Sequence, residues 1–269
     1  MWRQLAAFIV VALKGGVRDR VLAAILIVGL LLLLTTPVVA VFSMRQVVAL
    51  ATSYSFSIIS LMGLLLTLFM SVTLLARDLE QRSVYTVCSL PISRSSYLLG
   101  KFVGLAILVF IAIAIMGCFS GAAILMLERF YPPQQPFAWG AFFTGLWFQY
   151  WVFLMVGAIA VLFTTVATST FLPLALSVGI YFGSYSTEAV RYFVKSAGGQ
   201  ERLGPAVKMF GELVYWLLPN FSAFDLKAEV VYGLAMNGKS LLLTQLYGVG
   251  YVGIILVLAM IVFSRREFL

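Results

Sequence analysis

Long apolar stretches separated by short charged segments constrain this chain more than any other feature. The hydrocarbon core of a bilayer is about 30 Å thick, and a helix needs about 20 mostly apolar residues to cross it. Six stretches meet that length: 21–42, 55–76, 97–127, 139–166, 171–193 and 241–263. A soluble protein with 62% hydrophobic and 10% charged residues would expose an aggregation-prone surface. The sequence therefore predicts an all-α polytopic membrane protein, with six transmembrane helices in one domain covering 1–269.

Two further segments predict helices that do not cross the membrane. In residues 1–16, the apolar run 5–13 is too short to span and predicts an interfacial helix on the cytoplasmic face. A cleaved signal peptide is disfavoured, because the stretch 21–42 exceeds the usual signal core of about 7–15 residues. Residues 194–240 carry a second short apolar run at 210–218 and predict an outer helical segment. A connection of this length usually has a function.

The distribution of Lys and Arg predicts the orientation of the chain. Cytoplasmic loops of membrane proteins carry an excess of basic residues. In the six-span arrangement one side holds Arg3, Lys14, Arg18, Arg20, Arg77, Arg82, Arg94, Lys101, Arg265 and Arg266. Both termini are therefore expected in the cytoplasm.

Several function classes are disfavoured by composition. The chain has no His and only two Cys, so the commonest acid–base catalyst and the usual zinc ligand sets are missing. Its net charge of +8 is spread over loops and forms no dense patch for nucleic acid. Charged residues are almost absent from the spans, which disfavours a self-powered proton pump. We expect a non-catalytic chain that holds no metal or cofactor of its own.

A P-loop-like string occurs at Gly233, Gly238, Lys239 and Ser240. A P-loop works only where a strand feeds the loop and a helix follows it. No such pattern surrounds this string, and it maps to the outer side. We interpret it as a chance match.

A stripe of mostly polar residues follows one face of the second and of the fifth predicted span. On the second they are Ser53, Ser57, Ser60, Thr67 and Ser71. On the fifth they are Thr170, Pro173, Ser177, Tyr181, Ser184 and Glu188. Such faces favour close packing of helices within a membrane, or they line a translocation path or a subunit interface. Both interpretations stay open from the sequence.

The polar segment 77–96 joins the second and third spans. Residues 77–89 are compatible with a short cytoplasmic helix that ends at Pro91. Glu80 lies early in that helix, where the helix dipole favours a carboxylate. The segment is then either a solvated loop or a helix that docks in a groove of a cytoplasmic partner.

Three groups of residues carry a resemblance to a known family. They are Glu80 with Leu90-Pro91-Ile92-Ser93-Arg94 and Tyr97-Leu98-Leu99-Gly100-Lys101, then Leu218-Pro219-Asn220-Phe221 with Phe224-Asp225-Leu226, and the ending Phe263-Ser264-Arg265-Arg266-Glu267-Phe268. The first resembles the first cytoplasmic loop of type-2 ABC transporter permeases. The combination is similar to the subgroup containing the permease of the nitrous-oxide-reductase maturation system. Ser83 and Leu90 depart from the usual Gly and Lys, which leaves the partner ATPase open.

The resemblance implies a membrane subunit that pairs with a second copy of itself and with two cytoplasmic ATPase subunits. ATP and Mg²⁺ would be bound by the ATPases, and the complex would lie in a bacterial inner membrane. It also implies an ATPase-coupling set, namely Asp78, Glu80, Arg82, Val84, Val87, Pro91 and Arg94.

The path or dimer interface would be formed by Ser53, Ser57, Ser60, Thr67, Ser71, Ser177, Tyr181 and Ser184. A periplasmic partner at 194–240 is a further expectation. Two alternatives remain, a membrane scaffold that transports nothing and an ATP-independent carrier.

Overall fold

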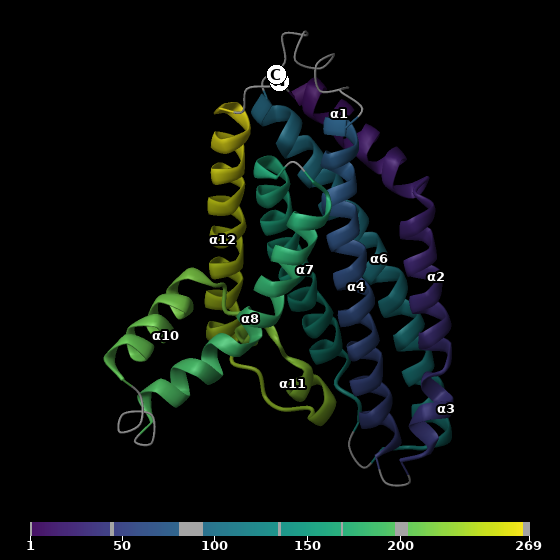
Figure 1. Cartoon of the computed structure of the whole chain (residues 1–269). Coiled ribbons are helices and arrows are strands. Elements are labelled where there is room, and N and C mark those ends of the chain that lie inside the picture. The colour runs from purple at the N-terminus through teal and green to yellow at the C-terminus, as the bar shows by residue number, and fades with distance from the viewer. Residues whose placement is uncertain are drawn as a thin grey trace.

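The computed structural model describes residues 2–43, 46–80, 94–133, 136–167, 169–196 and 204–265, and within these ranges every regular element is a helix (Figure 1). The elements are α1 (Trp2–Val17), α2 (Arg20–Leu34), α3 (Thr36–Val41), α4 (Val47–Glu80), α6 (Arg94–Phe130), α7 (Trp139–Val166), α8 (Phe171–Lys195), α10 (Pro205–Leu217), the 3-10 turn η1 (Ser222–Phe224), α11 (Lys227–Tyr232) and α12 (Gly238–Arg265). The expected all-α class is confirmed for this part of the chain.

Five of the described helical segments are long and apolar enough to cross a membrane. They are Arg20–Val41, Val47–Leu74, Ser95–Phe130, Trp139–Val166 and Gly238–Arg265. The last four run side by side as an upright bundle in Figure 1. We call the end where α4 ends and α6 begins the proximal end, and the end where α6 ends and α7 begins the distal end.

Helix α7 forms the centre of this bundle. In its most apolar window 72% of the residues are buried, against 22% in the segment Arg20–Val41. It packs against α4, α6, α8 and α12. A helix that is apolar on all sides suits such a position, because every face meets another helix. The peripheral helices instead leave apolar side chains exposed, as lipid-facing helices do.

The first predicted span, 21–42, is broken in the structure into α2 and α3. Pro37 lies in the first turn of α3. Proline has no N–H to donate to the preceding turn, so an uninterrupted helix is disfavoured there. The hydroxyl of Thr35 donates to the carbonyl oxygen of Leu32 at 2.6 Å and satisfies an acceptor at the break. The apolar length is kept, but the helix is not continuous.

The predicted fifth span is found as helix α8, yet it is not one of the five strongly apolar segments. Figure 1 shows α8 diverging from the bundle towards α10. The guanidinium carbon of Arg191 on α8 lies 4.1 Å from the ring centroid of Tyr215 on α10, a cation–π contact that joins the two helices. The membrane crossing expected for 171–193 therefore remains a prediction.

Helix α1 packs along α6 rather than standing apart from the bundle. A Cβ atom built on Gly104 of α6 would meet the Cβ of Ala12 at 2.5 Å, so only glycine permits this approach. A Cβ atom built on Gly16 of α1 would lie 2.4 Å from the side chain of Leu108. Helix α1 agrees with the expected N-terminal helix, and its place at the membrane surface stays a prediction.

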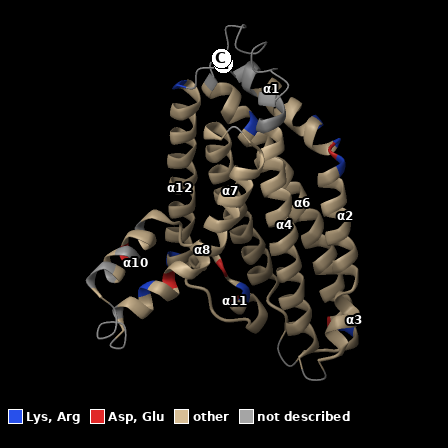
Figure 2. Ribbon diagram, in the orientation of Figure 1, with Lys and Arg blue, Asp and Glu red and all other residues tan. Residues whose placement is uncertain are grey.

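The predicted outer segment 194–240 contains α10, η1 and α11. Two phenylalanines of its turn, Phe221 and Phe224, are almost completely buried and anchor it to the bundle. Figure 2 shows acidic residues near the ends of α8 and α10 and both signs of charge beside α11. The bundle between its two ends is almost uncharged in the same view.

We predict that Gly63→Ala destabilises the protein by about 1–3 kcal/mol, the usual cost of overpacking a tight core. A Cβ atom at Gly63 would lie 2.4 Å from the ring of Phe153, whose side chain is fully buried and cannot move aside. Thermal unfolding in detergent, followed by size-exclusion fluorescence, measures the effect. The matched control is Gly253→Ala, because a Cβ atom at Gly253 would meet no atom of a neighbouring element within 4 Å. Equal melting temperatures for the two variants would contradict the packing at Gly63.

Candidate functional site

The predicted polar face of α4 divides into an exposed part, in which Ser57 is exposed and Ser53 and Ser60 are half-buried, and a buried part. Thr67 and Ser71 are almost fully buried, and their hydroxyls donate to the carbonyl oxygens of Gly63 and Thr67 at 2.7 and 2.6 Å. Both hydroxyl-bearing side chains face Gly157 of α7. This half of the stripe lies between helices of the same chain, where close packing accounts for it.

Ser60 forms a polar junction between three helices. Its hydroxyl oxygen lies 3.2 Å from the phenolic oxygen of Tyr181 on α8. It also accepts a hydrogen bond of 3.2 Å from the side-chain amide of Gln149 on α7. The structure therefore brings the two sequence-predicted polar faces together at Ser60 and Tyr181, within one chain.

Gln149 was missed by the sequence reasoning, although a signal for it exists. It is the one amide side chain in the apolar helix α7. Its side chain is only 7% exposed. A buried amide needs hydrogen-bond partners, so an isolated Gln in such a helix indicates a polar neighbour on another helix.

The predicted face of α8 points into the chain. Ser177, Tyr181 and Ser184 are buried, and so is Thr187 one turn further on. Neither the Ser177 nor the Ser184 hydroxyl makes a hydrogen bond to a described residue. Pro173 is buried on the same face, whereas Thr170 and Glu188 at its ends are exposed.

The motif around Phe221 packs against the polar junction. The ring of Phe221 lies 5.9 Å from that of Tyr181 and 5.8 Å from that of Tyr185, measured between centroids. The hydroxyl of Ser222 donates to the carbonyl oxygen of Tyr185 at 3.0 Å. These contacts give the Leu218–Phe221 motif a structural reason, because its last residue fills the space beside both tyrosines.

A groove opens beside the distal part of the α4 face. It lies between α4 and α11 and has a volume of about 420 Å³. The polar residues that line it are Ser43, Gln46, Ser53, Asp225 and Lys227. The ammonium of Lys227 donates to the hydroxyl of Ser57 at 2.8 Å. Lys227 was not predicted, because nothing in its local sequence indicates that α11 folds back against α4.

The predicted coupling set falls mostly on residues that the structure leaves undescribed. Arg82, Val84, Val87 and Pro91 lie in the segment 81–93, outside the described residues. The backbone is helical at Asp78 and Glu80, which belong to the last turn of α4, and Arg94 begins α6. The side chains of these three are also outside the described part. Residues 77–80 thus continue α4 instead of starting a separate helix.

The P-loop-like string lacks the required setting in the described ranges. Gly233 ends α11 with a left-handed φ of 62°, and α12 begins at Gly238. The helix after the loop is present, but the element before it is the short helix α11 and not a strand. The arrangement does not favour phosphate binding at this position.

Comparison with known proteins identifies the family. A family model described as ABC-2 family transporter protein matches residues 19–268, which is nearly the whole chain. A search of curated proteins returned no match. The match covers the bundle, the polar junction and the groove, and it agrees with the membrane-length helices of the structure. The chain is therefore a multi-pass membrane protein that belongs to the ABC-2 family of transporter proteins.

Proposed function

We propose that this chain is the permease subunit of an ATP-binding-cassette transporter. Separate cytoplasmic ATPase subunits would bind ATP and Mg²⁺, and this chain would convert their movement into export or mechanical transmission across the membrane. The family match over residues 19–268 is the observation that carries the proposal. The similarity of the Leu218–Phe221 motif and of the C-terminal sequence to the nitrous-oxide-reductase maturation permease favours that subgroup.

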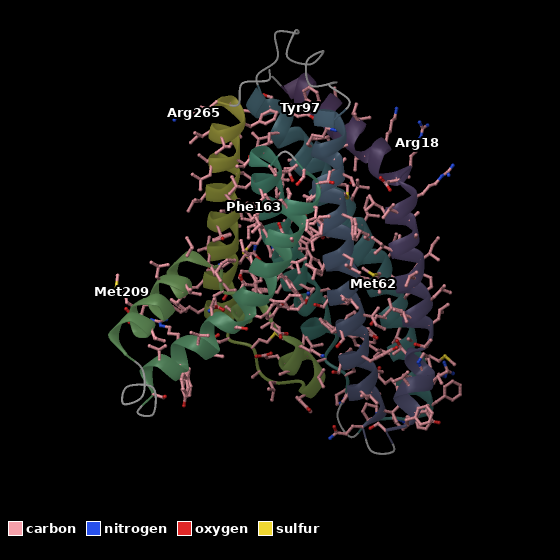
Figure 3. The ribbon with its side chains drawn as sticks, in the orientation of Figure 1. Arg18, Met62, Tyr97, Phe163, Met209 and Arg265 are labelled. Atoms are coloured by element: carbon pink, nitrogen blue, oxygen red, sulfur yellow. The ribbon has the colours of Figure 1, made fainter. Side chains whose placement is uncertain are left out.

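In the proposed topology, the proximal end of the bundle faces the cytoplasm of a bacterium and α8 makes the fifth of six crossings. Figure 3 supports one element of this topology, because Arg18 and Arg265 both lie at the proximal end. Basic residues at one end of a bundle are typical of the cytoplasmic side. The groove between α4 and α11 would then open towards the periplasm, where the segment 194–240 is available to a periplasmic partner.

We further propose that two copies of the chain assemble with the exposed part of the α4 face towards the twofold axis. Ser53, Ser57 and Ser60 lead from the groove to the junction with Tyr181 and Gln149. These hydroxyl and amide groups offer hydrogen bonds and carry no charge, whereas the groove end of the route also holds Asp225 and Lys227, whose ammonium donates to Ser57. Thr67 and Ser71 would respond to movement of α7 instead of contacting cargo, because α7 covers them.

The coupling set is tested by Glu80→Ala and Arg82→Ala. We expect each to weaken ATPase binding about thirtyfold or more, because truncating one partner of a buried interfacial charge pair costs about 2–5 kcal/mol and every 1.4 kcal/mol is about tenfold. Binding is measured by titrating the purified ATPase onto the chain in nanodiscs. The controls are Glu212→Ala and Arg129→Ala, two exposed charges in α10 and at the distal end of α6. Wild-type affinity in both test variants would refute the coupling assignment.

The axial placement is tested by cysteine crosslinking. In a background where Cys88 and Cys118 are replaced by Ser, we expect Ser57→Cys to form a crosslink between two copies with a short bis-maleimide. Ser57 is exposed, so a reagent can reach it. The control is Leu31→Cys on α2, which is 57% exposed and belongs to another face. A crosslink at position 31 with none at position 57 would place the dimer interface elsewhere.

A further inference from the structure

A second groove lies between α10, η1 and the distal half of α12, and we call it the α12 groove. Its volume is about 410 Å³, and sites for small molecules usually measure about 300–1,000 Å³. On α12 it is lined by Leu243, Thr244, Tyr247 and Tyr251. Most of this lining is apolar or aromatic, with a few polar groups among it. Such a surface suits a ligand that has a long apolar part and one polar end.

The base of the α12 groove is fixed by contacts between α12 and the turn η1. Phe224 of η1 is almost fully buried, and a Cβ atom built on Gly248 of α12 would lie 3.0 Å from its ring. The backbone N–H of Asn220 donates to the hydroxyl of Tyr247 at 3.1 Å. These contacts hold the two sides of the groove at a set distance, so a ligand would meet a site that is already formed.

The α12 groove opens onto the lipid-facing surface of α12. Leu243 and Tyr247 line the groove and are 59% and 42% exposed. The rest of α12 also exposes apolar side chains, namely Leu242, Leu246, Val249, Ile254, Val257, Leu258 and Ile261. A helix rises about 1.5 Å per residue, so positions 243–251 lie about 8–20 Å from the start of α12 at Gly238. Half a hydrocarbon core measures about 15 Å. The groove therefore lies at the depth of the leaflet on the distal side.

Helix α10, which borders the groove, has the features of a helix at the membrane surface. Met209, Leu213 and Leu217 follow one another at steps of four and are exposed. Figure 3 shows Met209 on the side of α10 that faces away from the bundle. An exposed apolar face on a short helix is typical of the boundary between lipid headgroups and acyl chains. Three of the groove residues are tyrosines, which are enriched at that boundary.

A basic residue and a hydroxyl lie next to the groove at the distal end of α12. Ser240 lies three and seven positions before Leu243 and Tyr247, so it belongs to the same face of the helix. Lys239 precedes it, and both residues are exposed. An ammonium group at a membrane surface attracts the phosphate of a lipid headgroup. The distance along α12 thus places a phosphate-binding group above an apolar groove.

We propose that the α12 groove binds a phospholipid, with one acyl chain along Leu243 to Tyr251 and with the phosphate at Lys239 and Ser240. The inference goes beyond the permease assignment and requires only that α12 crosses the membrane. The chosen occupant is a lipid because the groove is continuous with the lipid-facing surface of α12 and because Lys239 complements the charge of a phosphate. A lipid bound there contacts α10, η1 and α12 together, and it stabilises their arrangement.

The acyl-chain site is tested by filling the groove. The chain is freed of lipid in detergent and titrated with dioleoyl phosphatidylglycerol, and binding is followed by native mass spectrometry. Thr244→Trp places a large ring in the groove and is expected to weaken binding about tenfold or more. The control is Val249→Trp, because Val249 has nearly the shape of Thr and lies on the exposed apolar surface outside the groove. It is expected to bind as the wild type does. Wild-type affinity in Thr244→Trp, or equal loss in both variants, overturns the proposal.

The phosphate site is tested with dioleoylglycerol, which has the same acyl chains and no phosphate. We expect it to bind the wild type about fivefold more weakly than dioleoyl phosphatidylglycerol, the usual contribution of one basic residue at a membrane surface. Lys239→Ala is expected to remove this difference by weakening only the phospholipid. The control is Arg129→Ala, an exposed basic residue at the distal end of α6. Equal binding of both lipids by the wild type overturns the proposal, and so does equal weakening of both lipids in Lys239→Ala.

Two further measurements cover a variant that fails to fold and other occupants of the groove. If Thr244→Trp does not fold, the wild type is labelled with phosphatidylglycerol that carries a diazirine in its acyl chain. Label at 218–223 and 243–251 supports the proposal, and label confined to 254–261 overturns it. In a background without Cys88 and Cys118, a crosslink between two copies through Leu243→Cys would show that a second copy covers the groove, which also overturns it. None of these outcomes alters the test of ATPase binding, so the two proposals fail separately.

Discussion

The hydrocarbon core of a bilayer offers no hydrogen-bond partner, and this constraint decides where the polar groups of the chain lie. Most of the described polar side chains within the bundle bond to their own helix, meet a polar group of another helix or lie at an end, whereas the buried hydroxyls of Ser55, Ser120, Ser177 and Ser184 make no hydrogen bond to a described residue. Thr67 and Ser71 take the first route, and Ser60, Gln149 and Tyr181 take the second. The central position of α7 serves this arrangement, because it brings the Gln149 amide to the Ser60 hydroxyl. It also places Gly157, which has no side chain, against Thr67 and Ser71 of α4.

The two ends of the bundle are built differently. At the distal end, Phe221 packs beside Tyr181 and Tyr185 while Lys227 reaches the hydroxyl of Ser57, so the segment 218–232 is fastened to the exposed part of the α4 face. At the proximal end, Lys101 and Tyr97 join α1, α4, α6 and α12. Helix α4 passes through both regions.

The fold was largely predictable, because its strongest signals are local. Apolar length marked the membrane segments, and the bounds expected for 139–166 agree with α7. Pro132, Pro133 and Pro136 follow the end of α6 at Phe130, and proline disfavours the continuation of a helix. The break at Thr35 was equally readable from Pro37, but apolar length alone concealed it. The stretch 171–193 is less apolar than the other predicted spans, so its length alone gives a weaker signal for a membrane crossing. Its polar residues Ser177, Tyr181 and Ser184 are buried against the rest of the chain.

Only the site residues that recur at helical spacing could be predicted from the sequence. The stripes on α4 and α8 were identified, yet their contact through Ser60 and Tyr181 depends on helix packing that one sequence does not specify. Gln149 and Lys227 were missed because each acts through a partner far away in the chain. The buried state of Lys101 was hidden for a similar reason. A lysine next to a span end usually indicates topology. The burial of Lys101 becomes apparent only in the structure, where Tyr97, one turn earlier, packs against Phe8 of α1 and Phe263 of α12.

The central claim is that this chain works with a separate ATPase. The most direct measurement is mass spectrometry of the proteins that co-purify with the tagged chain after detergent extraction from its own host. The account predicts a P-loop ATPase in stoichiometric amount, together with a second copy of the chain. A preparation that contains the chain and no ATPase would contradict the account and favour a scaffold or an ATP-independent carrier.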